Sequence, residues 1–347
     1  MGIFLQILGV IFLILIILIL IVLFVQYKKK SNQLKANQLQ NVNAVNTPVH
    51  EFNEIELNEA LLELNSLEGL EDIKMEVNEL VKVTKYDIEE SEFDYNSITL
   101  HYVFSGNPGT GKTTVARLIA KIYKSLGILS VGQLVEVDRS DLVAGYIGQT
   151  ALLTKAKIDE AIGGVLFIDE AYALSGKGEK DFGIEAIETL LKGMEDNKGM
   201  FMVIVAGYSE PMQSFLSSNP GLKSRFDKVF NFSDYNTASL INITHRMFQE
   251  KKKTIDSFAN DIIESYFEHT KMLNEKTFGN AREVRKIVAE ALKNQKLRLS
   301  NIPAEERTDA LKNHILLDDV KEFQISIEAE SSEDKHGSIG YDYSEKE

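Results

Sequence analysis

Nine consecutive residues have the composition and spacing of a phosphate-binding loop. In order they are Gly106, Asn107, Pro108, Gly109, Thr110, Gly111, Lys112, Thr113 and Thr114. The glycines allow successive backbone N–H groups to point at phosphate oxygens without a clash of Cβ atoms. Lys112 is expected to reach the β- and γ-phosphates, and the Thr113 hydroxyl is expected to ligate Mg²⁺. The loop therefore predicts ATP and Mg²⁺ as cofactors.

A second pair of chemical groups follows an apolar run at residues 165–168. The segment VLFIDE ends in Asp169 and Glu170. Four apolar residues predict a strand that is buried on both faces and that presents both acids at its carboxyl end. We expect Asp169 to hold Mg²⁺ through water and Glu170 to polarise an attacking water. Runs of this kind are common by themselves, so the position after a phosphate-binding loop gives this one its meaning.

The elements that must position these groups alternate between strands and helices. Short apolar runs predict strands at 101–106, 133–138, 164–169, 200–207 and 228–232, and amphipathic segments predict helices at 113–126, 150–162 and 182–194. Such alternation predicts an α/β fold with a parallel sheet and helices on both faces, with ligands at the carboxyl ends of the strands. After residue 237 only helical patterns remain, at 237–252, 257–271, 280–298 and 304–313, which predict a small helical lid domain.

Five ordered segments resemble the CbxX/CfxQ branch of the AAA+ ATPases. They are HYVFSGNPGTGKTTVAR, DLVAGYIGQT, VLFIDEAYAL, NPGLKSRF and GNAREVRKI. This branch includes red-type Rubisco activases and proteins similar to stage V sporulation protein K, and type VII secretion AAA+ ATPases are related to it. The resemblance covers residues 63–300. It implies an AAA+ P-loop fold, ATP hydrolysis and a homo-oligomeric ring, expected to be a hexamer.

The resemblance also implies roles for three further side chains. Arg225, in NPGLKSRF, matches the arginine finger that reaches the γ-phosphate bound by a neighbouring subunit. Arg282, in GNAR, matches the second sensor on the lid. The first sensor of AAA+ proteins is usually Asn, whereas Tyr208 stands at that place here, so the identity of this sensor stays open. The ordinary alternatives are a surface arginine for Arg225 and a helix-start arginine for Arg282.

The residues Tyr146, Ile147 and Gly148 match the aromatic-hydrophobic-glycine pore loop of AAA+ proteins that thread substrates. An aromatic side chain between glycines can grip any polypeptide backbone by packing and can release it as the loop moves. The alternative is a tyrosine buried in a turn against the sheet. A motif of three residues is weak by itself, so this prediction depends on the match of the flanking segment.

The composition restricts the partners. The chain has 347 residues, a formal net charge of −14 and no cysteine. A strongly acidic chain without a basic stripe is a poor ligand for nucleic acid, so we expect no nucleic-acid partner. The absence of cysteine excludes disulfides and thiolate metal sites. The six histidines are scattered and show no paired spacing, so no transition-metal site is predicted.

The N-terminus departs from this soluble profile. Residues 3–25 are apolar except for Gln6, and Lys28, Lys29 and Lys30 follow. A helix of this length would span about 34 Å, against a hydrocarbon core of roughly 30 Å. The sequence therefore predicts a transmembrane helix, with the rest of the chain on the cytoplasmic side. A cleaved signal peptide is the alternative, but the basic n-region and the small-residue cleavage site that it needs are absent.

These patterns predict five parts: a transmembrane anchor with a basic flank at 1–30, a tether at 31–62, a nucleotide-binding α/β domain at 63–236, a lid with C-terminal helices at 237–325, and a disordered acidic tail at 326–347. The predicted function is an ATP-hydrolysing ring that remodels or threads an unidentified protein at the cytoplasmic face of a membrane. The alternative is a nucleotide-switched scaffold that assembles a membrane or secretion complex. Rubisco activation is disfavoured because a transmembrane anchor does not suit a soluble target.

Overall fold

The computed structural model describes residues 52–90, 101–146, 148–176, 181–226, 228–274 and 278–325. All of them belong to one compact unit, which begins at Phe52.

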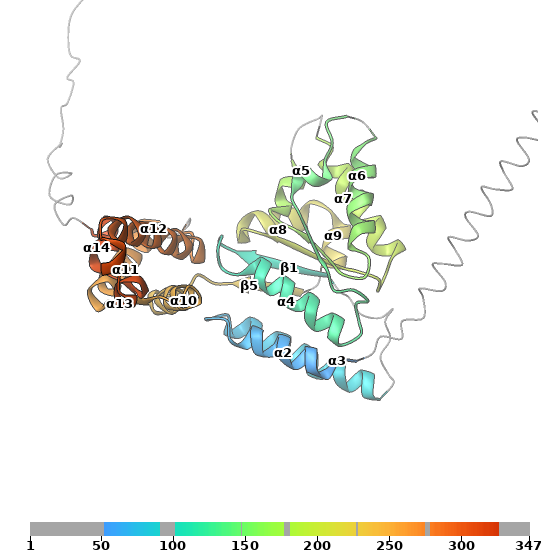
Figure 1. Ribbon diagram of the computed structural model, residues 1–347. Helices are drawn as coiled ribbons and strands as arrows, with labels where there is room; N and C mark the ends of the chain where they lie inside the picture. Colours follow the sequence, from blue (N-terminus) through green and yellow to red (C-terminus); the bar gives the residue numbers. More distant parts are fainter. Residues whose placement is uncertain are drawn as a thin grey trace, which may run out of the picture. The chain divides into compact units, whose positions relative to one another are not determined.

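Five parallel strands form the central sheet, in the order β2–β3–β4–β1–β5 (Figure 1). The strands are β1 (His101–Gly106), β2 (Leu134–Val137), β3 (Val165–Ile168), β4 (Met202–Gly207) and β5 (Lys228–Phe232). Each strand lies within or matches a segment that the sequence predicts. Because the first strand of the chain is placed between β4 and β5, the loop after β1 leaves the sheet beside the ends of both neighbours.

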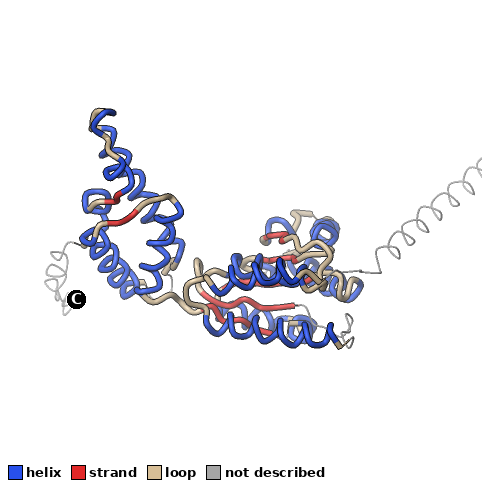
Figure 2. The backbone as a smooth tube through the Cα atoms, turned by 60° about the horizontal axis from the view of Figure 1, so that its bottom comes forward, coloured by secondary structure: helices blue, strands red, loops and turns tan. Residues whose placement is uncertain are grey.

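Helices cover both faces of the sheet, as Figure 2 shows. They are α2 (Glu54–Asn65), α3 (Glu71–Glu89), α4 (Lys112–Ser125), α5 (Arg139–Leu142), α6 (Thr150–Ala161), the 3₁₀ helix η1 (Ala171–Ser175), α7 (Gly183–Asp196), α8 (Ser209–Ser218) and α9 (Pro220–Arg225). Alternate residues of each strand face opposite sides. Phe104 and Phe167 therefore pack with α2, α3 and α4, whereas Val103 and Leu166 pack with the helices from α5 to α9.

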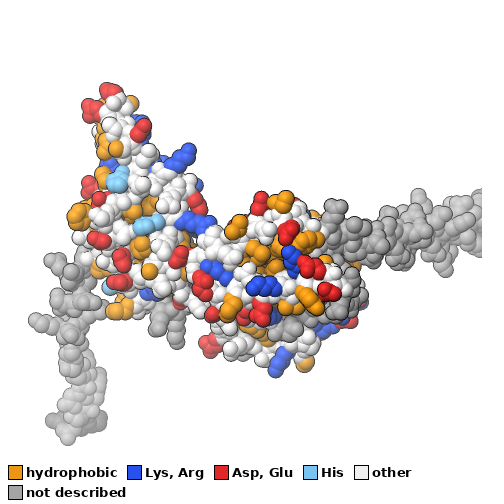
Figure 3. Space-filling model, turned by 90° about the horizontal axis from the view of Figure 1, so that it is seen from below, with side chains coloured by type: hydrophobic (Ala, Val, Ile, Leu, Met, Phe, Trp, Pro, Cys, Tyr) orange, Lys and Arg blue, Asp and Glu red, His pale blue; other side chains and the backbone are white. Residues whose placement is uncertain are grey.

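Helix α2 is attached to the sheet domain mainly through apolar packing against α4. Its Leu57, Ala60 and Leu64 are buried in the core, and burial of a leucine side chain contributes roughly 1.5–3 kcal/mol. Two exposed ion pairs also join the helices, Lys121–Glu63 and Lys124–Glu56, and each contributes less than about 1 kcal/mol. On the surface seen in Figure 3, acidic, basic and apolar side chains are interspersed.

The C-terminal helices form a lid with a core of its own. The elements are α10 (Thr237–Glu250), β6 (Thr254–Ile255), α11 (Ser257–Leu273), α12 (Ala281–Ser300), the 3₁₀ helix η2 (Ala304–Glu306), α13 (Asp309–Asn313), β7 (His314–Ile315), α14 (Leu317–Val320) and the 3₁₀ helix η3 (Lys321–Phe323). Phe248, Phe267 and Ile287 are completely or almost completely buried among them. The short parallel pair β6–β7 is absent from the sequence prediction, because two-residue strands leave no periodic pattern. The predicted AAA+ α/β fold with a helical lid is confirmed.

The predicted transmembrane helix is not supported and requires a correction. No helix in the described residues is both long and apolar enough to cross a membrane. The longest is α12, with 20 residues, and it carries arginine, lysine and glutamate side chains along its length. A spanning helix needs about 20 predominantly apolar residues. Residues 3–25, on which the prediction rests, lie outside the described residues. We therefore correct the fold to an AAA+ α/β domain with a lid, and we withdraw the localisation as a single-pass membrane protein.

The other predicted parts keep the status of predictions. Helix α2 begins at Glu54, inside the range predicted as a tether, and its apolar side chains belong to the core. Residues 31–51 of that range and the predicted tail at 326–347 lie outside the described residues.

Candidate functional site

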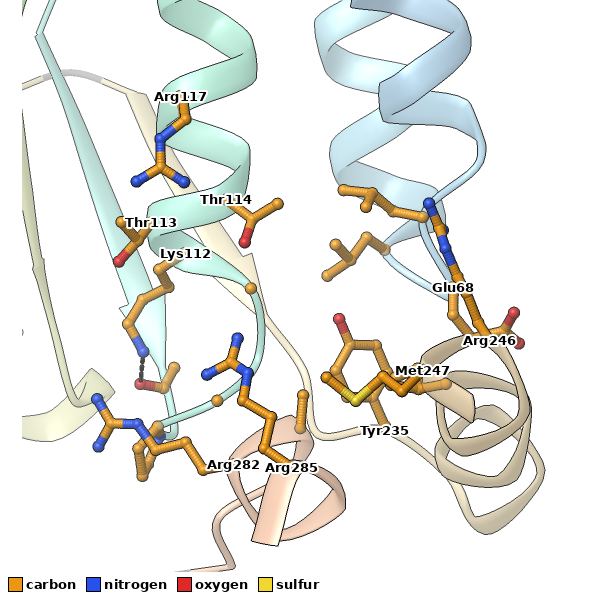
Figure 4. A pocket seen from close by; sticks show the side chains of 18 of the residues that line it. Glu68, Lys112, Thr113, Thr114, Arg117, Tyr235, Arg246, Met247, Arg282 and Arg285 are labelled. Carbon is orange, nitrogen blue, oxygen red and sulfur yellow. Dashed lines mark hydrogen bonds between the residues drawn. The ribbon is translucent and has the colours of Figure 1, made fainter. Parts of the chain in front are cut away.

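A cavity of about 670 Å³ lies where the carboxyl ends of β1, β3 and β4 meet the lid and the α2–α3 connection. This volume is typical of pockets that hold one small molecule, roughly 300–1,000 Å³. From the residues that the sequence singles out, the cavity brings together Gly106, Pro108, Gly109, Gly111, Lys112, Thr113, Thr114, Asp169, Glu170, Tyr208 and Arg282. Figure 4 shows Lys112 at the start of α4, with Arg282 and Arg285 reaching toward it from the lid.

The loop from β1 to α4 has the backbone that a phosphate cradle requires. Gly109 and Gly111 have φ angles of 74° and 100°, which residues with a Cβ rarely adopt. A Cβ on Gly109 would lie 2.1 Å from the carbonyl oxygen of Gly279 in the lid. The lid therefore touches this loop at a point where only glycine fits, and the Ala281 N–H donates a hydrogen bond of 3.1 Å to the Gly109 carbonyl.

Lys112 is folded back over this loop. Its Nζ donates hydrogen bonds of 2.8 Å to the carbonyl oxygens of Gly106 and Asn107. The pKa of Lys112 is lowered to about 8, mainly because the side chain is buried; the Asp169 carboxylate acts to raise it, and the nearby Arg282 guanidinium contributes to the lowering. A cation that is desolvated in this way has much to gain from an anionic ligand such as a phosphate.

The two acids leave the sheet directly after β3. This strand is buried at every residue, which explains why its apolar run ends abruptly at Asp169. Glu170 has a left-handed backbone with φ 49°, and its N–H donates to Asp169 Oδ1. Burial, together with the adjacent Glu170 carboxylate, raises the pKa of Tyr172 to about 12. Both acids line the same cavity as Lys112 and Thr113.

The opposite end of the cavity is lined by residues that the sequence does not single out. Figure 4 places Tyr235, Met247, Arg246 and Glu68 there. The Tyr235 hydroxyl donates a hydrogen bond of 3.2 Å to the Thr110 carbonyl, so this side chain joins the lid side to the phosphate loop. Burial raises the pKa of Tyr235 to about 12, and the Glu68 charge contributes to the shift. This end of the cavity gives no sequence signal, because it is assembled from segments far apart in the chain.

A network of polar side chains beneath the loop is also absent from the sequence prediction. The Asn107 amide donates to both carboxylate oxygens of Asp234, at 3.1 and 2.9 Å. Asn280, which is completely buried, donates to the same carboxylate at 2.8 Å. The sequence does contain a signal for two of these residues. Asp234 closely follows the last strand, at the ligand-binding edge of the sheet, and Asn280 belongs to the GNAR segment.

Several predicted residues lie elsewhere. Among the described residues, Arg225 is not one of those that line this cavity, and its guanidinium donates to Glu195 at 2.9 Å. Tyr146 is 74% exposed, and Gly148, with φ 80°, has open space around it. Ile147 lies outside the described residues. The alternative to a pore loop, a Tyr146 side chain buried in a turn against the sheet, does not agree with this exposure.

The residues present fit a magnesium–nucleotide. The loop offers backbone donors, a lysine and a hydroxyl, and β3 offers carboxylate oxygens, the ligand type that Mg²⁺ prefers. Within the described ranges, no group of three or more His, Cys, Asp or Glu could hold a metal ion by itself. A nucleotide site does not need one, because Mg²⁺ keeps several waters and takes further oxygens from phosphates.

A parallel sheet with a glycine-rich loop, a lysine at the start of the next helix and two acids after a buried strand defines a P-loop ATPase. Residues 102–234 match the model of the AAA family, ATPases associated with various cellular activities, and residues 236–331 match an AAA lid domain. The chain belongs to the CbxX/CfxQ branch of the AAA+ ATPases, and it is an ATP-hydrolysing enzyme.

Two curated relatives support this assignment. Stage V sporulation protein K of Bacillus subtilis (strain 168) is 42% identical over 70% of this chain and 76% of its own length. The chloroplastic ribulose bisphosphate carboxylase/oxygenase activase of Cyanidioschyzon merolae is 39% identical over 74% of this chain and 89% of its own. The crystal structure of the FIGL-1 AAA domain superposes with a TM-score of 0.51 at 18% identity, covering 75% and 81% of the two chains, and shows a shared fold.

Proposed function

We propose that this chain assembles into a ring, expected to be a hexamer, that uses ATP hydrolysis to remodel or thread other proteins. AAA+ proteins typically form rings. The observation that carries the proposal is the separation of Arg225 from the cavity that gathers Lys112, Asp169, Glu170 and Arg282. An arginine finger that cannot serve its own nucleotide suits a site that is completed by a neighbouring subunit.

The roles within the site follow from the chemistry of each group. Bound Mg²⁺–ATP supplies the phosphoryl group that is transferred to water. Lys112 would hold the β- and γ-phosphates, and Thr113 and Asp169 would hold Mg²⁺, the latter through water. Glu170 would orient and polarise the attacking water. Arg282 would contact the nucleotide from the lid, so that hydrolysis changes how the lid is held.

Tyr146 is the side chain that we propose contacts the substrate protein. It is 74% exposed on a loop that begins after α5 and ends at α6. Exposure of an aromatic ring to water is unfavourable in free energy, and contact with a polypeptide chain would remove its apolar surface from water. The exposure of Tyr146 supports a gripping role.

The second candidate is a nucleotide-switched scaffold, in which ATP controls assembly and no polypeptide is threaded. The pair Arg225–Glu195 favours this candidate, because an arginine that exchanges an exposed partner for a neighbour's phosphate would make ring formation depend on nucleotide. The two candidates differ in whether Tyr146 meets another protein in the ATP-bound state.

Photo-crosslinking from position 146 separates the candidates. A photoreactive phenylalanine analogue replaces Tyr146 in the Glu170→Gln protein, which is expected to retain ATP. The control carries the analogue at Leu152 on α6, which is 69% exposed. Threading predicts ATP-dependent crosslinks to another polypeptide at position 146 and not at 152. Equal crosslinking at both positions, or none at 146, would support the scaffold.

Purified Rubisco forms one arm of this experiment. The sequence argument against Rubisco as a substrate rests on the transmembrane anchor, and that argument lapses with the correction of the anchor. A crosslink from position 146 to Rubisco that requires ATP would name the substrate. In cell extract, a crosslink to a different protein and none to Rubisco would assign a different substrate.

A further inference from the structure

The start of α12 is anchored to the phosphate loop by one buried side chain. Asn280 has no exposed surface, and its amide group is fully engaged. Its Oδ1 accepts from the Tyr235 N–H at 2.9 Å, and its Nδ2 donates to Asp234 at 2.8 Å, to the Phe278 carbonyl at 3.1 Å and to the Pro108 carbonyl at 3.3 Å. These hydrogen bonds fix the orientation of Asn280 with respect to two other segments, the phosphate loop and the connection after β5.

The backbone at Asn280 is held in an unfavourable conformation. Its φ is 49° and its ψ is −126°, which residues with a Cβ seldom adopt. Such conformations persist where the surrounding contacts determine them, and they concentrate at functional sites. Here the contacts are the hydrogen bonds of the Asn280 side-chain amide and the hydrogen bond from the neighbouring Ala281 N–H to the Gly109 carbonyl. Arg282 follows two residues after this point and lines the cavity.

Asp234 is the centre of the network. Its carboxylate accepts from the Asn107 amide in the phosphate loop and from the Asn280 amide in the lid. The three residues are separated by 127 and 46 positions in the chain, so they meet only in the folded domain. A carboxylate that accepts hydrogen bonds from two amides restricts the orientation of both, because each amide must direct an N–H toward it.

We propose that Asp234, Asn107 and Asn280 form a positioning network that sets the angle of the lid against the phosphate loop and thereby places Arg282 on the nucleotide. None of the three needs to touch a reacting atom. If the lid rotates, either the hydrogen bond between Asp234 and Asn280 breaks or Asn107 moves with the lid. Loss of the γ-phosphate would therefore be transmitted to the lid through these hydrogen bonds. The inference rests on the proposed nucleotide roles of Lys112 and Arg282.

Exchange of the two polar groups tests this network. In the full-length chain, Asn280→Asp places two carboxylates against each other, and Asp234→Asn removes the charged acceptor. Each is expected to weaken ATP binding by about tenfold, the usual effect of losing a hydrogen bond to a charged group. The double variant Asp234→Asn/Asn280→Asp restores one amide–carboxylate pair with the opposite polarity. It should recover part of the loss that either single variant shows, because the aspartate cannot donate to the carbonyl oxygens of Phe278 and Pro108.

Matched controls separate positioning from folding. Asn236→Asp makes the same change of charge two residues from Asp234, at a helix-capping side chain that an aspartate can replace. It should leave ATP affinity within about twofold of wild type. The thermal unfolding of all variants is measured in parallel. A loss of stability in the single variants with unchanged ATP affinity would overturn the proposal, because it would reduce the network to a structural role.

A second cycle tests the link to Arg282. If Asn280 acts by placing Arg282, then Arg282→Ala should cost much less ATP affinity in the Asn280→Asp protein than in wild type. Equal and additive losses, or a double exchange that recovers nothing, would overturn the positioning role. Lys112→Ala distinguishes this failure from failure of the proposed site. If Lys112→Ala abolishes ATP binding while the variants of Asp234 and Asn280 bind ATP as wild type does, only the proposed network is wrong. Unchanged ATP binding in Lys112→Ala would refute the proposed nucleotide site itself.

Discussion

The guanidinium of Arg225 donates a hydrogen bond of 2.9 Å to the carboxylate of Glu195 in the same chain. The Glu195 side chain is 68% exposed, so the pair contributes less than about 1 kcal/mol and can be exchanged readily. A neighbouring subunit's phosphate would therefore compete easily for Arg225. A weak, exposed pair of this kind suits the proposed role of Arg225 on another subunit's nucleotide.

The first prediction concerns removal of Glu195, the partner of Arg225 in this pair. Glu195→Gln should leave steady-state ATP hydrolysis within about twofold of wild type, because an exposed pair contributes little. Arg225→Ala should bind ATP and hydrolyse it about 10³-fold more slowly. Phosphate release by both variants is measured under conditions in which the wild type is fully assembled. Equal losses in the two variants would mean that Arg225 matters only as a partner of Glu195.

Substitutions in the phosphate loop and in the acids after β3 should have different effects on ATP binding and on ATP hydrolysis. Lys112→Ala should abolish measurable ATP binding, because it removes the cation that faces the phosphates. Glu170→Gln should retain ATP and lose at least about 10²-fold in turnover, as is typical when a general base is removed. ATP binding and phosphate release are measured separately. Turnover at the wild-type rate in Glu170→Gln would assign the base to another residue.

The contact between Gly109 and the lid provides a steric test. A methyl group at Gly109 would meet the Gly279 carbonyl at 2.1 Å, and the backbone there has φ 74°. Gly109→Ala should lower the free energy of unfolding by roughly 1–3 kcal/mol and should weaken ATP binding. Gly145→Ala is the control, because a Cβ there has no atom within 4 Å. Equal behaviour of the two variants in thermal unfolding and ATP titration would show that the lid does not touch the loop.

The ion pair between Arg139 and Asp181 gives a prediction for pH. Arg139 donates to Asp181 at 2.6 Å, and this hydrogen bond holds the pKa of Asp181 below its ordinary value. Stability from a lowered carboxyl pKa is present above the unfolded value, about 3.9, and is lost as the pH falls through the folded value. Asp181→Asn should therefore be less stable than wild type by roughly 1 kcal/mol at pH 7.

The same difference should persist at pH 5 and shrink below about pH 4, as Asp181 itself becomes protonated. Denaturant unfolding of both proteins at several pH values measures it. Asp159→Asn serves as the comparison, because Asp159 pairs with Lys155 on an exposed helix surface, where the side chains are 58% and 66% accessible. A difference for Asp181→Asn that is independent of pH would exclude the charge as its cause.

Local patterns predict the strands and the phosphate loop well. The run at 228–232 coincides with β5, and the helix predicted at 113–126 is α4, shifted by one residue at each end. Both succeed because burial on one side leaves a periodic pattern in the sequence itself: β5 buries Phe230 and Phe232 between exposed residues, and α4 buries a helical stripe. The lysine and the two acids are found for a related reason, since each is fixed within a few residues of such an element.

The network beneath the loop is not predicted, because its members are far apart in the chain. Nothing near Asn107 in sequence indicates that its amide meets Asp234, and nothing near Asp234 indicates Asn280. An asparagine inside a glycine-rich loop is typical of a turn, which conceals a second role. The transmembrane prediction depends on a local pattern at residues 3–25, and no helix in the described part of the chain is long and apolar enough to support it.

Complementation between two inactive proteins tests the shared site most directly. Arg225→Ala subunits keep the phosphate loop, and Lys112→Ala subunits keep the finger. In a head-to-tail ring each interface joins one subunit's cavity to its neighbour's finger, so a random equal mixture should rebuild about a quarter of the sites. We predict that ATP hydrolysis recovers on mixing, toward about a quarter of wild type. No recovery, in mixtures that light scattering and differently tagged subunits show to contain mixed rings, would contradict a site completed by Arg225 of a neighbour.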